Sequence, residues 1–220
     1  MIAAGRVGAA VGAAHPQRQE GPTIVTSPER HYEDVLAGFG ARVRAVAPEA
    51  WDGPTPNIGW SVRELVNHVT AEQLWAVPLL AGETIDEVGD RFAGDVLGAD
   101  PVVVWERAAA QARQAFSEPD ALERTVCLSS GPALAAEYCF QMTTDLLVHG
   151  WDLAVAIGET VRPDPIVVHE TLMALRPQAA GWRASGAFGA PVELAFGASE
   201  WATLLALTGR DPAWRPPAAA

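Results

Sequence analysis

The sequence predicts an all-α protein, an antiparallel four-helix bundle followed by a short tail of helix and strand. In four long segments, apolar residues recur at intervals of three and four, the period of a helix with one buried face. Loops of moderate length join these segments, which favours antiparallel neighbours. We therefore expect residues 29–160 to form the bundle and residues 161–220 to form a tail packed on it. Residues 1–28, rich in Ala and Gly, are expected to be a flexible extension.

The first predicted helix begins at Pro28 and ends before Pro48. A Pro- and Gly-rich connector, DGPTPNIGW, then leads to a helix that runs to about residue 80. Ser61 can cap this second helix while Glu64 reaches back to the Ser61 amide, which is the pattern of a capping box. His68 lies about two turns into this helix, where we expect it to face neighbouring helices.

Residues 82–100 are acidic and interrupted by glycine, and we interpret them as a loop that covers the site. The third helix is predicted over residues 101–116. The fourth is predicted to begin at Pro132 or Ala133 and to end at Ile157, because Gly158 suits the position after a helix C-terminus.

The tail shows three weaker patterns. A fifth helix is predicted over residues 165–182, a short strand over VELAF at 192–196, and a short amphipathic helix over 200–207 before the closing TGRDPAW.

Composition excludes several classes of function. The formal net charge is -12 and there is no basic run, so the chain lacks the clustered cations that nucleic-acid binding requires. No apolar run approaches the ~20 residues of a membrane-spanning helix. Cys127 and Cys139 show no CxxC spacing and are expected to be reduced, which suits a cytoplasmic protein. The absence of lysine and the abundance of Ala, Gly and Pro suggest a GC-rich bacterium such as an actinomycete.

Asp145 and His149 form the first candidate for a functional pair. They are four residues apart in a helical segment, so both side chains leave the same face. The surrounding residues are strongly apolar, and a carboxylate buried there must be paired, hydrogen-bonded or bound to metal. His68 would complete a set of two histidines and one carboxylate, which holds a divalent metal and leaves coordination positions open.

Simpler interpretations of these residues stay open. Asp145 and His149 could be a surface pair, and His68 a hydrogen-bonded core histidine. Glu72, four residues after His68, could supply the carboxylate instead or line a substrate pocket. Asp152 could orient a ligand histidine without touching the metal, and Trp151 could form a wall of the pocket.

Three motifs carry a resemblance to a known family: GWSVRELVNHV, TTDLLVHGWDLAVAIG and the closing GRDPAW. Over residues 30 to 215 the chain resembles the actinobacterial metal-binding branch of the DinB-like superfamily, which includes mycothiol-dependent maleylpyruvate isomerases and thiol S-transferases. The resemblance implies a four-helix bundle with a divalent metal on His68, Asp145 and His149. The isomerases carry glutamate where this chain has Asp145, and they have a larger C-terminal domain.

The resemblance implies metal-assisted activation of a low-molecular-weight thiol, mycothiol in actinobacteria, for S-transfer to a small electrophilic substrate or its isomerisation. The ligand set suits zinc first, with nickel, iron and manganese as alternatives. Two other functions fit the same residues: a hydrolase or lyase that activates water, and a non-catalytic bundle that binds a metal or small molecule. Family analogy also suggests a homodimer.

Overall fold

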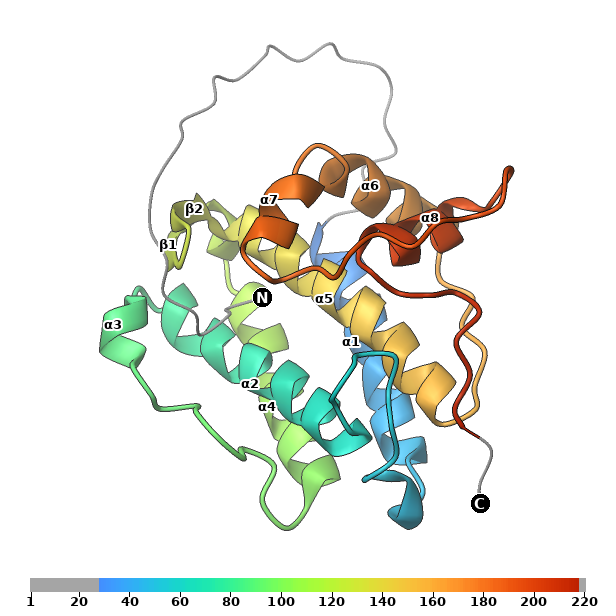
Figure 1. The fold of residues 1–220 in the computed structure, drawn as a ribbon. Helices are drawn as coiled ribbons and strands as arrows, with labels where there is room; N and C mark the ends of the chain where they lie inside the picture. The colour runs from blue at the N-terminus through green and yellow to red at the C-terminus, as the bar shows by residue number, and fades with distance from the viewer. Residues whose placement is uncertain (1–27, 218–220) are drawn as a thin grey trace.

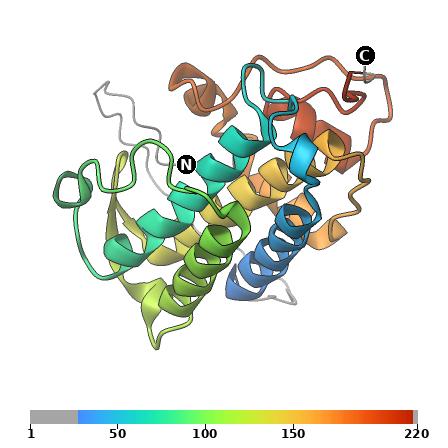
Figure 2. The same ribbon diagram turned by 90° about the horizontal axis from the view of Figure 1, so that it is seen from below.

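Four long helices dominate the computed structural model, which describes residues 28–217. The mostly helical fold predicted from the sequence is confirmed. α1 packs against α4 and α5, and α2 packs against the same two helices, so the four close a ring of contacts. Figures 1 and 2 show their long axes running roughly side by side. The four are α1 (Pro28–Ala45), α2 (Val62–Leu80), α4 (Pro101–Phe116) and α5 (Ala135–Ala156). The extension expected over residues 1–28 lies outside the described residues except for Pro28.

Aromatic side chains fill the space between these helices. Phe39 of α1 lies with its ring centroid 4.7 Å from that of Trp105 on α4, and both side chains are buried. Tyr32 and Phe116 pair the same two helices at 4.9 Å. Such pairs bury large apolar areas and add the attraction between ring edges and faces, so they fix the frame on which α2 and α5 present their side chains.

The start of α2 is set by its cap. The Ser61 side chain accepts a hydrogen bond from the Glu64 amide, and the Glu64 carboxylate accepts one from the Ser61 amide at 2.7 Å. The predicted capping box is thus confirmed. A 3-10 turn at Pro48–Ala50 precedes the connector. Within the connector, the Thr55 hydroxyl donates to the Trp60 carbonyl at 2.9 Å, which holds Trp60 directly before the helix.

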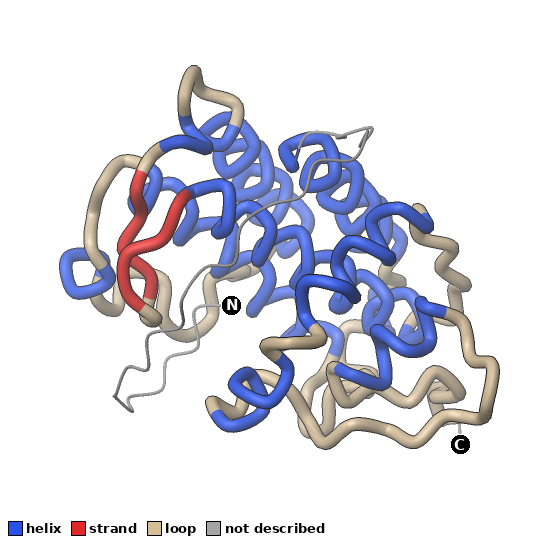
Figure 3. Tube along the Cα trace, turned by 90° about the horizontal axis from the view of Figure 1, so that it is seen from above, coloured by secondary structure: helices blue, strands red, loops and turns tan. Residues whose placement is uncertain are grey.

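A β-hairpin between α4 and α5 was not predicted. Strand β1 (Thr125–Leu128) pairs antiparallel with β2 (Gly131–Leu134), and a 3-10 turn at Ala121–Glu123 precedes them. Figure 3 shows the two strands in red at one end of the helices. Because residues 131–134 are extended, α5 begins at Ala135 and not at Pro132 or Ala133 as predicted.

The tail differs from its prediction in two places. The expected helix over 165–182 is divided into α6 (Pro165–Leu175) and α7 (Ala179–Ala184), because Pro177 between them lacks an amide donor and clashes with the preceding turn. The expected strand at 192–196 is also wrong. Val192 donates one backbone hydrogen bond to Ala206, but the segment has no partner strand among the described residues. The helix expected over 200–207 is present as α8 (Glu200–Leu207).

The three tail helices lie together beside α5, on the side away from α2 and α4 (Figure 1). Residues of α6 and α8, with Phe188 after α7 and one residue of α5, form a second, smaller core, against which Trp182 of α7 packs. It consists of Leu147, Val167, Val168, Leu172, Leu175, Phe188 and Leu204. In the part of the chain that is described, no helix has both the length and the apolar character needed to cross a lipid bilayer.

Candidate metal centre

The structure brings His68, Asp145 and His149 together. Asp145 and His149 lie one turn apart on α5, with 3% and 6% of their surfaces exposed. His68 approaches from the neighbouring helix α2, on which it is only partly buried. One potential ligand atom from each residue lies within 4.8 Å of the other two. The i, i+4 pair Asp145 and His149 on α5 and His68 on α2 therefore converge on one site.

The separations between these atoms suit a shared cation better than hydrogen bonds. His68 Nε2 lies 3.7 Å from Asp145 Oδ2, and His149 Nε2 lies 3.5 Å from Asp145 Oδ1. Both distances exceed those of good hydrogen bonds. Two ligands on one tetrahedral ion, each about 2.1 Å from it, are about 3.4 Å apart. Asp145 Oδ2 is moreover buried without a hydrogen-bond partner, which is costly unless a cation fills the gap. The residues present therefore fit a divalent metal.

Burial sets the protonation of His68. Removal of its side chain from water lowers the pKa of His68, and the nearby Asp145 carboxylate only partly opposes this shift. Burial acts on the Asp145 carboxyl in the opposite direction, but the Coulombic effect of neighbouring groups, His149 first among them, lowers the pKa of Asp145. A neutral imidazole and an ionised carboxylate are the forms in which both groups bind metals.

Asp152 orients the His149 ring through Nδ1, the ring nitrogen that does not face Asp145. Its Oδ2 lies 2.9 Å from His149 Nδ1, and the side chain is fully buried. Burial raises the pKa of Asp152, but Arg210 and the hydrogen bond with His149 reverse this and lower it, so the carboxylate is ionised. His149 Nδ1–H therefore donates to Asp152, and Nε2 is left facing Asp145.

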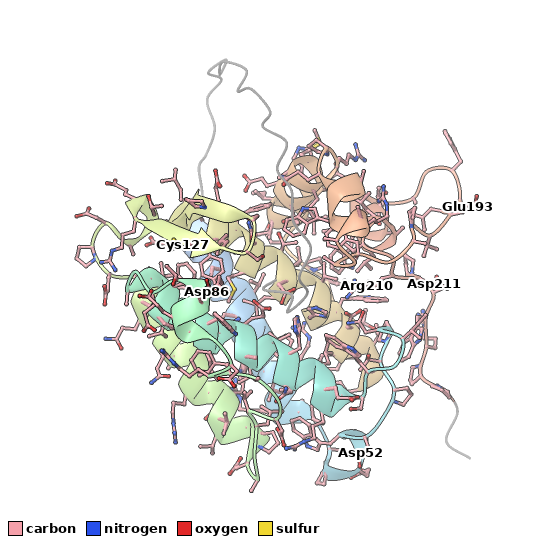
Figure 4. All side chains as sticks on the ribbon, turned by 60° about the vertical axis from the view of Figure 1, so that its left-hand side comes forward. Asp52, Asp86, Cys127, Glu193, Arg210 and Asp211 are labelled. Carbon is pink, nitrogen blue, oxygen red and sulfur yellow. The ribbon has the colours of Figure 1, made fainter. Side chains whose placement is uncertain are left out.

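Arg210 holds the other side of Asp152. Its Nη2 donates to Asp152 Oδ2 at 2.9 Å, and its Nη1 donates to the Thr208 carbonyl at 3.0 Å. Arg210 follows α8 and is buried against α5; Figure 4 labels it beside the more peripheral Asp211. The C-terminal tail thus contributes directly to the geometry of the centre.

A cavity of about 480 Å³ opens onto the three residues. Trp60 forms an aromatic wall, with its ring centroid 4.9 Å from that of His68 and 6.0 Å from that of His149. The remaining wall comes from the connector before α2, from α5 and from the tail. Residues lining it include Asn57, Ile58, Thr144, Val148, Phe188 and Arg210.

Two residues proposed for the pocket from the sequence do not line this cavity. Trp151 is buried and lines a separate hollow near Gly158 and Pro212, because it leaves α5 on a different face from Asp145 and His149. Glu72 is buried within α2, one turn beyond His68. Neither belongs to the lining of the metal cavity.

The loop over residues 82–100 does not cover the site either. It contains a short helix, α3 (Ile85–Val88), and is tied to the outer side of α2. The Asn67 side-chain amide donates to the Gly94 carbonyl at 2.9 Å and accepts from the Val96 amide at 2.8 Å. No residue of this loop lines the cavity.

Sequence reasoning missed Trp60 and Arg210 as parts of the site. The signals were present: Trp60 directly precedes the cap of the helix that carries His68, and Arg210 lies in the closing GRDPAW motif. His169 is exposed on α6 and does not line the cavity, and its Nδ1 lies 2.9 Å from Glu200 Oε1.

Comparisons with known proteins identify the family of this chain. The family model described as mycothiol maleylpyruvate isomerase N-terminal domain matches residues 32–154, a span that includes all three candidate ligands. Two proteins described as uncharacterised, from two strains of Mycobacterium tuberculosis, are each 32% identical over 149 residues. These matches cover 66% of this chain and 73% of theirs.

Two solved structures have a similar fold. They are a mycothiol-dependent maleylpyruvate isomerase, with a TM-score of 0.55, and a histidine-to-alanine variant of it, with a TM-score of 0.58. Each is 17% identical and matches 75% of this chain and 73% of the isomerase chain. The chain belongs to the mycothiol maleylpyruvate isomerase N-terminal domain family of the DinB-like superfamily.

Proposed function

We propose that this protein is an enzyme that activates a low-molecular-weight thiol, of the mycothiol type, at a divalent metal held by His68, Asp145 and His149. The observation that carries the proposal is the convergence of these three side chains around the unpartnered, buried Asp145 Oδ2. The activated thiol would act on a small electrophilic substrate, either by S-transfer or by addition and elimination that isomerises a double bond. Zinc is our first assignment for the metal, because it accepts neutral imidazole and carboxylate ligands in open sites.

The bound metal would lower the pKa of a thiol at its open position and so supply the thiolate nucleophile. The chain's own residues would do the rest. Asp152 and Arg210 would keep His149 in the tautomer that presents Nε2. Trp60 would shield the two histidines from water on one side.

The two cysteines support a thiol from outside the chain. Burial, with a smaller contribution from Glu29, raises the pKa of Cys139 to about 12, so its thiol is not a nucleophile at neutral pH. Cys127 lies on β1 and does not line the metal cavity. The reactive sulfur would therefore come from a co-substrate.

We also assign residues 29–160 as a DinB-like four-helix bundle that carries the metal, and residues 161–220 as the tail that completes the cavity. Arg210 and Phe188, both of which line the cavity, support this division of roles.

The test is turnover with mycothiol and an electrophile by the zinc-loaded protein, compared with the His149→Ala variant. We expect thiol-dependent turnover in the wild type and a loss of about 100-fold or more in the variant, because one metal ligand is removed. The matched control is His169→Ala, which removes an exposed histidine far from the centre. Metal-dependent turnover of an ester or amide without thiol would contradict the proposal and favour a hydrolase; absence of any turnover would favour a binding protein.

A further inference from the structure

A second cavity adjoins the metal cavity and has no role in the proposed metal binding or thiol activation. Its volume is about 420 Å³, and it lies between α5, α6 and α7. Thr144 and Phe188 line both cavities, so the two share a wall next to Asp145. Together they provide room for two reactants rather than one.

The chemistry of the second cavity is aromatic. Phe140, Trp182 and Phe188 line it, with the rings of the last two 6.0 Å apart between centroids. Its polar side chains are the carboxylate of Glu137, the amides of Gln141 and Gln178 and the hydroxyl of Thr144. No arginine, lysine or histidine is among its lining residues. Apolar walls with neutral hydroxyl and amide groups, one exposed carboxylate and no cation suit an uncharged ligand better than an anion.

Basic side chains are also scarce in the lining of the metal cavity. Besides the two candidate ligand histidines, Arg210 is the one basic residue in its described lining. The Arg210 guanidinium is already occupied by Asp152 and the Thr208 carbonyl. A small dicarboxylate would therefore lose its hydration in either cavity without gaining a free guanidinium. The metal would offer it little in return, because Asp145 offsets part of the metal's charge and the thiol takes its open position.

We propose that the second cavity binds the uncharged aromatic or apolar body of the electrophilic co-substrate. The electrophilic carbon would lie at the shared wall of Thr144 and Phe188, where it meets the thiol in the metal cavity. Two reactants held within about 3.5 Å in this way react as one bound pair. The proposal rests on the proposed thiol chemistry, and it makes uncharged aromatic electrophiles, rather than small dianions, the preferred substrate class.

A chlorinated dinitrobenzene, 1-chloro-2,4-dinitrobenzene, is a suitable reactive probe. In its reaction with mycothiol, a carbon–sulfur bond forms at the ring carbon that carries chlorine, and the carbon–chlorine bond breaks. Chloride leaves with the bonding electron pair, and the thiol proton goes to water. No oxidant or reductant is needed.

The variant that tests the site is Ala174→Phe, which adds a ring inside the second cavity without removing a core side chain. Ala110→Phe, at an exposed position on α4, is the matched control. Binding of 1-naphthol, an uncharged aromatic probe, and of maleate, a small dianion, is measured by calorimetry on the zinc-loaded proteins. KM values for 1-chloro-2,4-dinitrobenzene and for mycothiol are measured in parallel.

We expect Ala174→Phe to weaken 1-naphthol binding by about tenfold or more, equivalent to about 1.4 kcal/mol, and Ala110→Phe to leave it unchanged. KM for the chlorinated probe should rise in Ala174→Phe, while KM for mycothiol and the metal content stay as in the wild type. The proposal would be overturned if Ala174→Phe bound 1-naphthol as tightly as the wild type, or if the wild type did not bind 1-naphthol at all. It would also be overturned if Ala174→Phe lost tenfold in maleate binding and not in 1-naphthol binding. If mycothiol-dependent turnover is absent from the wild type, the thiol function fails, and 1-naphthol binding still decides what the cavity holds.

Discussion

At the scale of single residues, Asp152 is the side chain that links the tail to the candidate metal centre. Its carboxylate accepts from His149 Nδ1 on one side and from Arg210 on the other. Carboxylates in this position raise the basicity of a ligand imidazole and fix its orientation. The metal affinity of the centre should therefore depend on a residue that does not touch the metal.

Asp152→Asn tests this dependence. The amide keeps the shape of the side chain but loses the charge that Arg210 and His149 share, so we expect zinc affinity to fall by about 10–100-fold. Competition with a chelator measures the change. Asp211→Asn is the control, because Asp211 is exposed and its carboxylate accepts a hydrogen bond from the nearby Ala213 amide at 2.8 Å rather than from His149 or Arg210. Equal zinc affinity in wild type and Asp152→Asn would show that Asp152 has no such role.

Cys139 gives a prediction about pH. The pKa of its thiol is about 12 in the folded protein, because it is buried, whereas a thiol in an unfolded chain ionises near pH 8.5. Above about pH 8.5 the unfolded state thus binds fewer protons than the folded state, and stability must fall as pH rises, by up to about 1.4 kcal/mol per pH unit from this group. Cys139→Ala should remove this part of the slope.

Urea unfolding of wild type and Cys139→Ala between pH 6 and pH 10 measures the effect. The two stability curves should run parallel below about pH 8, where the thiol is protonated in both states, which provides an internal control. Above about pH 8.5 the stability of the wild type should fall more steeply with pH than that of Cys139→Ala. Equal slopes in that range would mean that the Cys139 thiol ionises as readily in the folded protein as in the unfolded chain, and would contradict this prediction.

The candidate ligands could be predicted from the sequence because helical spacing relates residues within a turn. Asp145 and His149 are such a pair, and the family motif added His68. Trp60 and Arg210 could not be placed in the same way, because they reach the site from a connector and a tail. Their position depends on how α2 and α8 pack against α5, which no spacing along the chain encodes.

At the scale of the elements, α2 matters most because it carries His68. Its first turn depends on the reciprocal hydrogen bonds between Ser61 and Glu64. Ser61→Ala removes the side-chain acceptor and should lower the free energy of unfolding by about 1 kcal/mol.

Urea denaturation checks this value, and Ser61→Asp is the control. Aspartate also accepts from the exposed amides and carries a negative charge that favours a helix N-terminus, so it should retain most of the stability. Equal losses in the Ala and Asp variants would mean that the side chain at position 61 contributes through something other than the cap.

Elements with strong local signals were predictable, and those that depend on distant partners were not. The capping pattern at Ser61 predicted the start of α2, and Gly158 predicted the end of α5. The β1–β2 hairpin was missed because its strands have four residues each and lie beside a long helical pattern. The VELAF segment has strand-like residues, but strand formation needs a partner strand. Among the described residues the segment has none, and Val192 donates its hydrogen bond to Ala206 of α8.

At the scale of the whole molecule, a close backbone contact between Gly189 and Gly209 holds two segments of the tail together. Gly209 has a φ of +88°, and a Cβ atom added there would lie 2.7 Å from the Gly189 Cα. This contact joins the turn before Arg210 to the segment that lines the metal cavity. A larger residue at position 209 must displace one of the two.

Gly209→Ala should therefore lower stability by about 2–4 kcal/mol, from a strained φ and a backbone clash together, and should also weaken zinc binding by moving Arg210. Thermal unfolding and chelator competition measure the two effects. Gly197→Ala is a matched control: its φ is +83°, but nothing lies within 4 Å of the added Cβ. It should show the cost of the φ alone, of about 1 kcal/mol, with zinc affinity unchanged. Equal effects of the two variants on stability and on zinc affinity would show that the contact between Gly189 and Gly209 contributes to neither.

The central claim is that His68, Asp145 and His149 bind one divalent metal. Its most direct test is metal analysis of purified protein after zinc loading and removal of free metal, with His68→Ala, Asp145→Ala, His149→Ala and the control His169→Ala alongside the wild type. We predict about one zinc per chain in the wild type and in His169→Ala, and a loss of tightly bound zinc in each of the other three, because each removes one of three ligands. Zinc retained at wild-type stoichiometry and affinity by these three variants, or no bound metal in the wild type, would contradict the claim.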